Sequence, residues 1–333
     1  MPIVSTRLSA LCLAAVCLGT VHAVEPSVPQ VFAPGVLSGP AHDSAPAFTP
    51  DGDTVYFGRS SAAQSTILVA HRRGRSWSTP EVASFSGEWG DMEPAMAPDG
   101  SYLVFVSSRP IAAGGAEIQG RFNGAMQKGG NLWRVDRRGA GWGTPVRLPD
   151  AVNIGTATFA PSVAADGSLW FMATDADSGK FRLFRSQWHD GAFEKAQPLP
   201  FSDGKVTDVD PVVAPDESFV VFGSGRLKGR GIDLFVAFRD GGGWGEPIWL
   251  GDVVNSSGSD AEPRLDPDRR TLYFSSERTL PVAFPRSREQ AIVDQARLLA
   301  WDNGNYNLWS VSLAPWLDAH RDGTPMPGVA AGP

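Results

Sequence analysis

The chain has 333 residues, of which 36 are acidic and 29 are Lys or Arg, and its formal net charge is -7. A mildly acidic chain is a poor candidate for binding the phosphate backbone, so we expect no nucleic-acid partner. Both cysteines, Cys12 and Cys17, lie near the N-terminus. The sequence after them therefore excludes disulfides and thiolate metal sites, and we expect no cofactor and no metal.

The first residues are typical of a secretory signal peptide. Arg7 precedes the apolar run LSALCLAAVCLGTV, and Val21-His22-Ala23 offers the small residues that a signal peptidase needs. We expect residues 1–23 to be removed after Ala23. The apolar run is too short to span a bilayer, and nothing later approaches ~20 apolar residues. The sequence thus predicts a periplasmic or secreted protein that does not insert into a membrane.

After a Pro-rich lead at residues 24–30, one pattern recurs five times at a spacing of about fifty residues. Each copy begins three positions before a proline, with an aspartate in four copies and a threonine in the third. An inner apolar position, a turn and an apolar-aromatic triplet follow. The copies begin at Asp43, Asp91, Thr158, Asp208 and Asp260. Such a period, made of short strands and Gly/Pro turns, indicates the blades of a β-propeller.

The apolar-aromatic triplets predict β-strands that are buried on both faces, and hence an all-β fold. They read Val55-Tyr-Phe57, Leu103-Val-Phe105, Leu169-Trp-Phe171, Val220-Val-Phe222 and Leu272-Tyr-Phe274. Three consecutive apolar residues are expected where one sheet packs between two others. We therefore predict four strands in each repeat.

The two ends of the chain complement each other. Residues 31–37 lie in the register of an outermost strand, which elsewhere carries Trp-x-x-Pro, but they have no blade of their own. The fifth repeat stops at Leu313 without such a strand. We predict that residues 31–37 complete the fifth blade and close the ring. The expected organisation is one propeller of five blades at residues 31–313 and a C-terminal tail at 314–333.

The repeat resembles the TolB-type, WD-like β-propeller repeat, in which an acid precedes x-x-Pro and Pro-Asp-Gly precedes an aromatic strand ending in Ser-x-Arg. The resemblance covers residues 31–313. It implies an envelope protein whose propeller recognises other proteins. TolB itself looks six-bladed, so a ring of six blades is the alternative.

Two long insertions, at residues 110–130 and 279–306, predict which face of the ring binds a ligand. The second contains a helix signal, with Ser287 as N-cap and an apolar stripe of Ile292, Ala296 and Leu299. This helix either packs over the blade rim, the interpretation we favour, or meets a partner. The expected binding-face residues are Asp43, Arg121, Phe122, Arg288 and Trp301.

Acid and arginine recur at a constant interval within blades, as Asp91 and Arg109, Asp208 and Arg226, and Asp260 and Arg278. In the third repeat both are replaced together, by Thr158 and Asp175. Joint replacement favours structural pairs that tie two loops of one blade. The alternative is a ring of carboxylates at the channel mouth, comprising Asp43, Glu93, Asp210 and Glu262, that could perform glycoside chemistry or hold a hard cation.

Catalytic motifs do not support an enzyme. The sequence lacks G-x-S-x-G and H-E-x-x-H. The segment from Asp175 to Gly179 resembles a calcium loop without its closing Glu, so a tight hairpin is favoured. We expect a monomeric, non-enzymatic propeller that binds a protein or cell-envelope component. An envelope glycan hydrolase or lyase using the channel-mouth carboxylates is the alternative.

Overall fold

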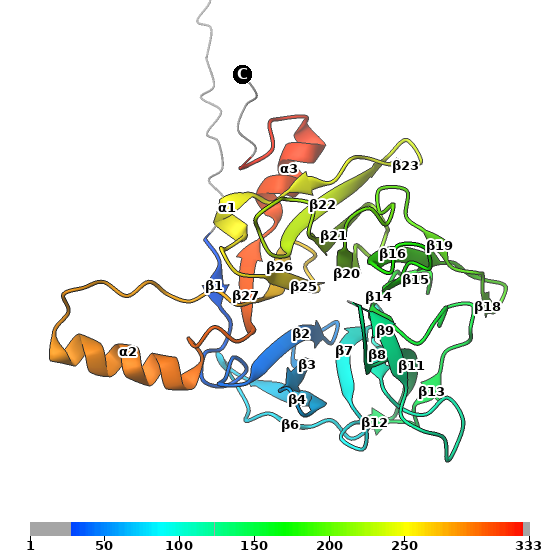
Figure 1. Cartoon of the computed structure of the whole chain (residues 1–333), viewed down its shortest axis with the longest axis horizontal. Helices are drawn as coiled ribbons and strands as arrows, with labels where there is room; N and C mark the ends of the chain where they lie inside the picture. The colour runs from blue at the N-terminus through cyan, green and yellow to red at the C-terminus, as the bar shows by residue number, and fades with distance from the viewer. Residues whose placement is uncertain (1–27, 123, 329–333) are drawn as a thin grey trace, which may run out of the picture.

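The computed structural model describes residues 28–122 and 124–328, which form a β-propeller of five blades (Figure 1). The innermost strands of successive blades contact one another, and the first meets the fifth. The all-β class and the five-blade count are confirmed, and the six-blade alternative does not apply. The expected signal peptide and its cut after Ala23 lie outside the described residues.

Each blade is one antiparallel sheet whose strands are ordered outward from the axis. Blade 1 consists of β2 (His42–Phe48), β3 (Thr54–Ser60), β4 (Ser65–Arg73), β5 (Ser76–Trp77) and β6 (Glu81–Val82). Blade 2 consists of β7 (Asp91–Met96), β8 (Tyr102–Ser107), β11 (Asn131–Arg138), β12 (Gly141–Trp142) and β13 (Val146–Arg147). Blade 3 consists of β14 (Thr158–Val163), β15 (Leu169–Thr174), β16 (Phe181–Ser186) and β19 (Gln197–Pro198), with the hairpin β17 (Trp188–His189) and β18 (Ala192–Phe193) beside it.

The last two blades complete the ring. Blade 4 consists of β20 (Asp208–Val213), β21 (Phe219–Ser224), β22 (Asp233–Asp240), β23 (Gly243–Trp244) and β24 (Ile248–Trp249). Blade 5 consists of β25 (Asp260–Leu265), β26 (Thr271–Ser276), β27 (Asn307–Ser312) and β1 (Gln30–Val31). Outside the blades lie the hairpin β9 (Gln119–Phe122) and β10 (Ala125–Lys128), and the helices α1 (Gly251–Val254), α2 (Arg288–Ala300) and α3 (Ala314–Asp322).

The predicted triplets supply the core between blades. Their last residues are fully buried in all five blades: Phe57, Phe105, Phe171, Phe222 and Phe274. Burying an aromatic side chain of this size contributes about 1.5–3 kcal/mol. The same position in every blade therefore holds neighbouring sheets together.

The N-terminal strand closes the ring as expected. β1 pairs with β27, with Val31 opposite Trp309. Ser38 then donates its hydroxyl to the carbonyl of Leu308 at 3.2 Å. The strand is shorter than the predicted residues 31–37, because the chain turns at Ala33 (φ 46°) and Gly35 (φ 79°).

All five innermost strands contain the same irregularity. The key prolines are those that follow the first residue of each repeat by three positions: Pro46, Pro94, Pro161, Pro211 and Pro263. In each repeat, the residue before the key proline has a left-handed backbone, with φ between 48° and 55°, and the pairing register shifts there. These residues are Ala45, Glu93, Ala160, Asp210 and Glu262. A β-bulge re-aims a side chain. Here it brings the three acidic members together on the ring axis.

Candidate functional site

Three carboxyls from different blades meet on the ring axis. Glu93 and Asp210 are 6% and 5% exposed. Glu93 Oε2 accepts a hydrogen bond from the backbone N–H of Ala160 at 2.6 Å, and Asp210 Oδ2 accepts one from Glu262 N at 3.2 Å. The axis is therefore a closed cluster held by backbone donors of neighbouring blades.

Burial governs the electrostatics of this cluster. Loss of water, followed by repulsion from Asp210 and Glu262, raises the pKa of Glu93 to about 8. Burial, followed by repulsion from Glu262, raises the pKa of Asp210 to about 7. Interacting carboxyls share protons as a group, so the cluster retains protons at neutral pH.

Arg264 crosses the axis and was missed by the sequence analysis. It is 4% exposed. Its Nε donates to the carbonyl of Pro94 in blade 2 at 3.3 Å, and its Nη1 donates to that of Pro263 at 2.8 Å. Its Nη2 is buried without a hydrogen-bond partner among the described residues. The equivalent positions of the other blades hold only small side chains, Ala47, Ala95, Ser162 and Val212, which leaves the axis to the guanidinium.

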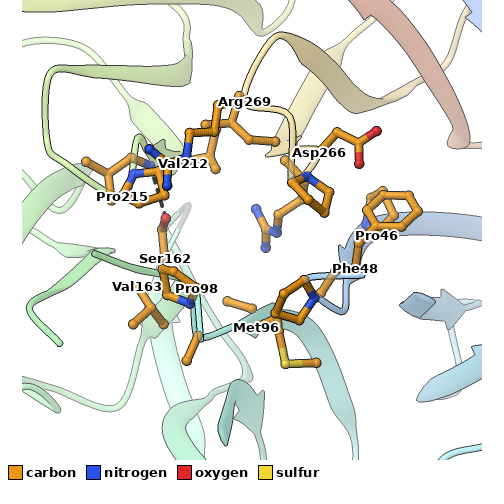
Figure 2. A pocket seen from close by; sticks show the side chains of 18 of the residues that line it. Pro46, Phe48, Met96, Pro98, Ser162, Val163, Val212, Pro215, Asp266 and Arg269 are labelled. Atoms are coloured by element: carbon orange, nitrogen blue, oxygen red, sulfur yellow. Dashed lines mark hydrogen bonds between the residues drawn. The ribbon is translucent and has the colours of Figure 1, made fainter. Parts of the chain in front are cut away.

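A cavity of about 190 Å³ lies beside Arg264 on the ring axis. All five blades contribute to its wall, which Figure 2 shows from close by. Its mouth is formed by the short turns that follow the innermost strands, at Pro50, Pro98, Pro215 and Pro267. These turns lie on the face opposite to the one that the insertions predicted. Prolines recurring four residues after the key prolines were the available signal.

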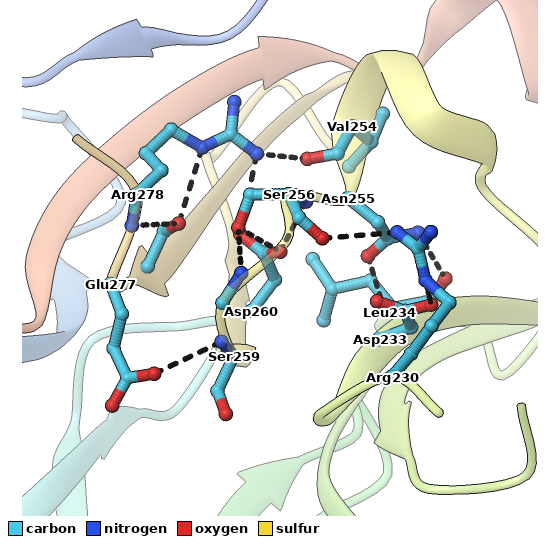
Figure 3. Close-up of polar contacts among 12 residues, drawn as sticks. Arg230, Asp233, Leu234, Val254, Asn255, Ser256, Ser259, Asp260, Glu277 and Arg278 are labelled. Carbon is cyan, nitrogen blue, oxygen red and sulfur yellow. Dashed lines mark hydrogen bonds and ion pairs between the residues drawn. The ribbon is translucent and has the colours of Figure 1, made fainter. Parts of the chain in front are cut away.

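The acid–arginine residues singled out from the sequence lie together in pairs. The N···O distances are 2.5 Å for Arg109–Asp91, 2.8 Å for Arg226–Asp208 and 3.3 Å for Arg278–Asp260. Figure 3 shows the last pair, in which Arg278 also donates to the carbonyl of Val254. Ser256 N donates to the other oxygen of Asp260 at 2.6 Å. Each pair thus joins two loops at one end of its blade.

Asp43 is also paired, which corrects its assignment to the binding face. Arg59 Nε lies 2.6 Å from Asp43 Oδ1, and Gly39 N donates to Oδ2 at 2.6 Å. Asp43 is fully buried, and burial raises its pKa despite the hydrogen bond from Arg59. A ligand on the surface cannot reach this carboxyl.

The carboxyls named for glycan hydrolysis do not form an open pair. A retaining or inverting hydrolase needs two carboxyls on either side of a bound sugar. Asp43 is held by Arg59, whereas Glu93 and Asp210 are closed in on the axis. Neither Glu93 nor Asp210 lines the axial cavity, and this geometry gives the hydrolase alternative no support.

In blade 3, Asp175 stands at the arginine position of the acid–arginine pair and makes other contacts. Asp175 Oδ1 accepts backbone N–H bonds from Asp177 at 3.1 Å and Ser178 at 2.9 Å, while Arg182 lies 3.3 Å from Oδ2. This is the tight hairpin favoured from the sequence. Within residues 28–122 and 124–328, no group of three or more His, Asp or Glu is placed to hold a metal ion.

The helix in the second insertion forms as predicted but faces the other way. Ser287 caps α2 by accepting from Gln290 N at 3.2 Å. The predicted stripe is exposed, with Ile292 at 58% and Leu299 at 69%. In Figure 1, α2 extends away from the ring. The favoured interpretation, a helix packed over the blade rim, is therefore wrong.

The polar side of α2 faces its own supporting segment. Asp294 is 7% exposed, and its two oxygens lie 2.5 Å from Arg286 Nη1 and 3.6 Å from Arg297 Nη2. Arg297 Nε also lies 2.5 Å from Asp302. Ion pairs thus hold the inner side of the helix, and apolar side chains point outward.

The first insertion lies against its neighbour instead. Phe122 packs against Phe159 and Phe181, with ring centroids 5.6 Å and 5.5 Å apart. It is half-buried by these contacts, whereas the sequence placed it on the binding face. Trp301 is half-buried against Trp309 at 6.0 Å. Arg121 and Arg288 are exposed, as the binding-face prediction requires.

A groove of about 700 Å³ lies beside the start of the first insertion. Its lining includes Trp89, Trp133, Arg109 and Ile111. Arg109 lies over the Trp133 ring at 5.7 Å and is already paired with Asp91. The predicted binding face therefore carries a concave feature, this groove, and a projecting feature, α2.

Among known proteins, only solved structures are found to be similar to this chain. No family model matches the chain, and no curated protein is similar to it. A putative TolB from Agrobacterium tumefaciens has 16% identity and a TM-score of 0.47, over 71% of this chain and 70% of that one. TolB from Acinetobacter baumannii has 14% identity and a TM-score of 0.45, over 82% of this chain and 54% of that one. A Hadza microbial sialidase has 15% identity and a TM-score of 0.44, over 72% and 54%.

These similarities concern the fold, and this chain spans only about half the length of the second and third structures. We take no activity or partner from them. Among the described helices, none is long and apolar enough to cross a lipid bilayer.

Proposed function

We propose that this chain is an exported, non-enzymatic recognition module that binds a protein of the cell envelope through the face carrying insertions 110–130 and 279–306. The observation that carries the proposal is the outward apolar stripe of α2. A surface helix normally turns its apolar side to the core. Here Ile292, Val293 and Leu299 are each more than half exposed, which is the arrangement of a helix presented to a partner.

The segment around α2 is built to present it. Ser287 caps the N-terminus, and the pairs of Asp294 with Arg286 and Arg297 fix the inner side. Trp301 anchors the C-terminus, because it packs on Trp309 and its carbonyl accepts from Asn307 Nδ2 at 2.6 Å. A preformed helix loses less conformational entropy on binding.

The occupant we propose is a protein with an apolar groove. Ile292, Ala296 and Leu299 follow the i, i+4, i+7 spacing by which a helix fills such a groove. A second copy fits less well, because two helices of 13 residues, each ~20 Å long, would bury well under the ~1,200 Å² of stable interfaces. A lipid surface is disfavoured because Arg286 and Arg297 are held by acids rather than lining the stripe.

Site-specific crosslinking tests this proposal. A photo-crosslinking amino acid would replace Ile292 in the full-length protein, expressed in its native cells, and the captured product would be identified by mass spectrometry. We expect one envelope protein, with capture lowered about tenfold or more by Leu299→Asp. Val146→Asp is the matched control, because Val146 is 64% exposed in β13, away from α2. Both variants should melt at the wild-type temperature, since the changed side chains are exposed.

Three results would refute the proposal. One is capture of a second copy of this chain, with a sedimenting dimer that Leu299→Asp dissociates. Another is flotation of the purified protein with vesicles of anionic phospholipid in a Leu299-dependent manner. The third is capture that persists in Leu299→Asp but is lost in Val146→Asp.

A further inference from the structure

The axial cavity ends on a guanidinium in which one nitrogen, Nη2, has no hydrogen-bond partner among the described residues. Nε and Nη1 of Arg264 both donate to backbone carbonyls, which fixes the group in place. Nη2 is buried and unpartnered among the described residues, and Arg264 lines the cavity. Leaving a buried donor unpaired destabilises the folded state. Arg264 therefore brings its positive charge to the end of the cavity, where it attracts a negatively charged acceptor.

A second donor and apolar walls complete the cavity. Ser162 also lines it, and its Oγ accepts from Val213 N at 3.0 Å, so its proton remains available for donation. Most of the wall is apolar, and includes Pro46, Met96, Val163, Val212 and Pro215. The volume of about 190 Å³ is below the ~300 Å³ of a drug-sized site and equals roughly six waters of ~30 Å³ each. The fitting ligand is an acceptor on a short apolar body.

The surrounding charges limit that acceptor to a single negative charge. Glu93, Asp210 and Glu262 all interact with Arg264 from the axis, so a doubly charged anion would be repelled. Arg269 and Asp266 line the mouth. Asp266 is hydrogen-bonded to Tyr273, and burial raises the pKa of its carboxyl. A cation would find donors rather than acceptors at Arg264 and Ser162.

We propose that this cavity binds one carboxylate carried on a short apolar body, with a carboxylate oxygen accepting from Arg264 and Ser162. The carboxylate belongs either to a free short-chain acid or to the C-terminus of a peptide with an apolar last residue. The site is separate from α2 and independent of the function proposed for it.

The acidic cluster gives the binding a distinctive pH dependence. The pKa values of about 7 for Asp210 and about 8 for Glu93 mean that both ionise as pH rises from near 6 to near 9. Their negative charge then accumulates beside Arg264, whereas a short-chain acid is already ionised throughout. Carboxylate affinity therefore falls with rising pH.

Titration with isobutyrate, followed by calorimetry and NMR, tests the proposal on the full-length protein. We expect a dissociation constant on the order of 1 mM near pH 6, and weaker binding near pH 9. Isobutyramide, which has the same shape without the charge, should bind about tenfold more weakly or worse. Arg264→Gln should lower isobutyrate affinity about tenfold or more, whereas Arg269→Gln, at the exposed rim, should change it less than ~3-fold.

A gain of binding guards against a variant that merely fails to fold. Glu93→Gln keeps an acceptor for Ala160 N but cannot ionise, so it should bind isobutyrate more tightly than wild type near pH 9. A short peptide ending in valine, compared with its C-terminal amide, distinguishes the two sources. If the free-acid peptide binds more tightly than isobutyrate and the amide does not, the source is a peptide end; if isobutyrate binds more tightly, it is a free acid.

Several outcomes would overturn the carboxylate site. They are equal binding of isobutyrate and isobutyramide, unchanged affinity in a folded Arg264→Gln protein, and affinity that rises with pH. Failure of isobutyrate to bind wild type at about 100 mM near pH 6, well above the expected constant, would also overturn it.

Discussion

Two regions of this ring, the ends of the blades and the axis, bring buried carboxyls and arginines together in different ways. At the blade ends of blades 1, 2, 4 and 5, a fully buried aspartate faces its own arginine. On the axis, Glu93, Asp210 and Glu262 share Arg264. The blade-end pairs balance charge locally. The axis is short of positive charge and of hydrogen-bond partners, so it is the region that protons or a ligand can occupy.

The two regions also differ in backbone. The axial acids have φ near 50°, a conformation that costs an L-residue about 1–2 kcal/mol. The same backbone occurs at Ala45 and Ala160, which carry no charge. The bulge is therefore a property of every blade, and three blades add a carboxyl to it.

Breaking a blade-end pair should have the largest effect. Asp91→Ala leaves the guanidinium of Arg109, whose side chain is 11% exposed, buried without its carboxylate. We expect a loss of about 3 kcal/mol in the free energy of unfolding, measured by urea denaturation. In Asp91→Ala/Arg109→Ala the loss should be smaller than the sum of the two single changes. The exposed pair Arg72–Asp53 is the control, and removing it should cost under ~0.5 kcal/mol. Strict additivity at Asp91 and Arg109 would show that the two side chains are not coupled.

Removing one axial charge should change the free energy of unfolding by an intermediate amount. At high pH it should stabilise the protein, whereas breaking a blade-end pair destabilises it. The pKa of Glu93, about 8 in the folded protein, exceeds its ordinary value of 4.5, so the folded state holds a proton that the unfolded chain releases between these values. Wild-type stability from this group is thus full below about pH 4.5 and declines as pH rises to about 8. Glu93→Gln should flatten this decline and be more stable than wild type by about 1–3 kcal/mol near pH 9.

Urea denaturation of wild type and Glu93→Gln near pH 5, 7 and 9 measures this difference. The charged groups that act on Glu93 in the wild type are Asp210, Glu262 and Arg264. The exposed Glu88 supplies the control, and Glu88→Gln should follow the wild-type curve. A Glu93→Gln protein that loses stability with pH as steeply as wild type would place the titrating group elsewhere.

The smallest effect should come from relaxing the bulge where it bears no charge. Ala45→Gly removes the left-handed strain of a Cβ but gives the unfolded chain more freedom. These terms nearly cancel, and we expect a change within about 0.5 kcal/mol by thermal denaturation. A loss above ~2 kcal/mol would mean that the Ala45 methyl, and not the backbone shape, matters at this position.

The blade-end pairs could be anticipated because they recur. Asp91 and Arg109, Asp208 and Arg226, and Asp260 and Arg278 share one interval, and blade 3 replaces both members together. Recurrence also identified the buried triplets and the closing strand. A repeated position reveals its role through its five copies.

Arg264 could not be found in this way, since its counterparts are Ala47, Ala95, Ser162 and Val212. A single departure from a repeat gives no indication of whether its side chain crosses the axis or turns to solvent. The orientation of α2 was hidden for a related reason. The stripe of Ile292 and Leu299 is the same whichever side meets the ring. The ion pairs of Asp294 with Arg286 and Arg297 lie on the other side, and the apolar periodicity does not contain these polar contacts.

The closing strand has a consequence for the order in which the protein folds. Ser38 bonds to Leu308, 270 positions later, so the last blade is finished by nearly the first described residues. Contacts between distant parts of a chain form slowly, because loop-closure entropy is lost before they add stability. During synthesis, β1 emerges early and stays unpaired until β27 appears. A chain halted before β27 is therefore an open arc with exposed strand edges, which are prone to pair with other chains, and release of the last residues turns the arc into a ring.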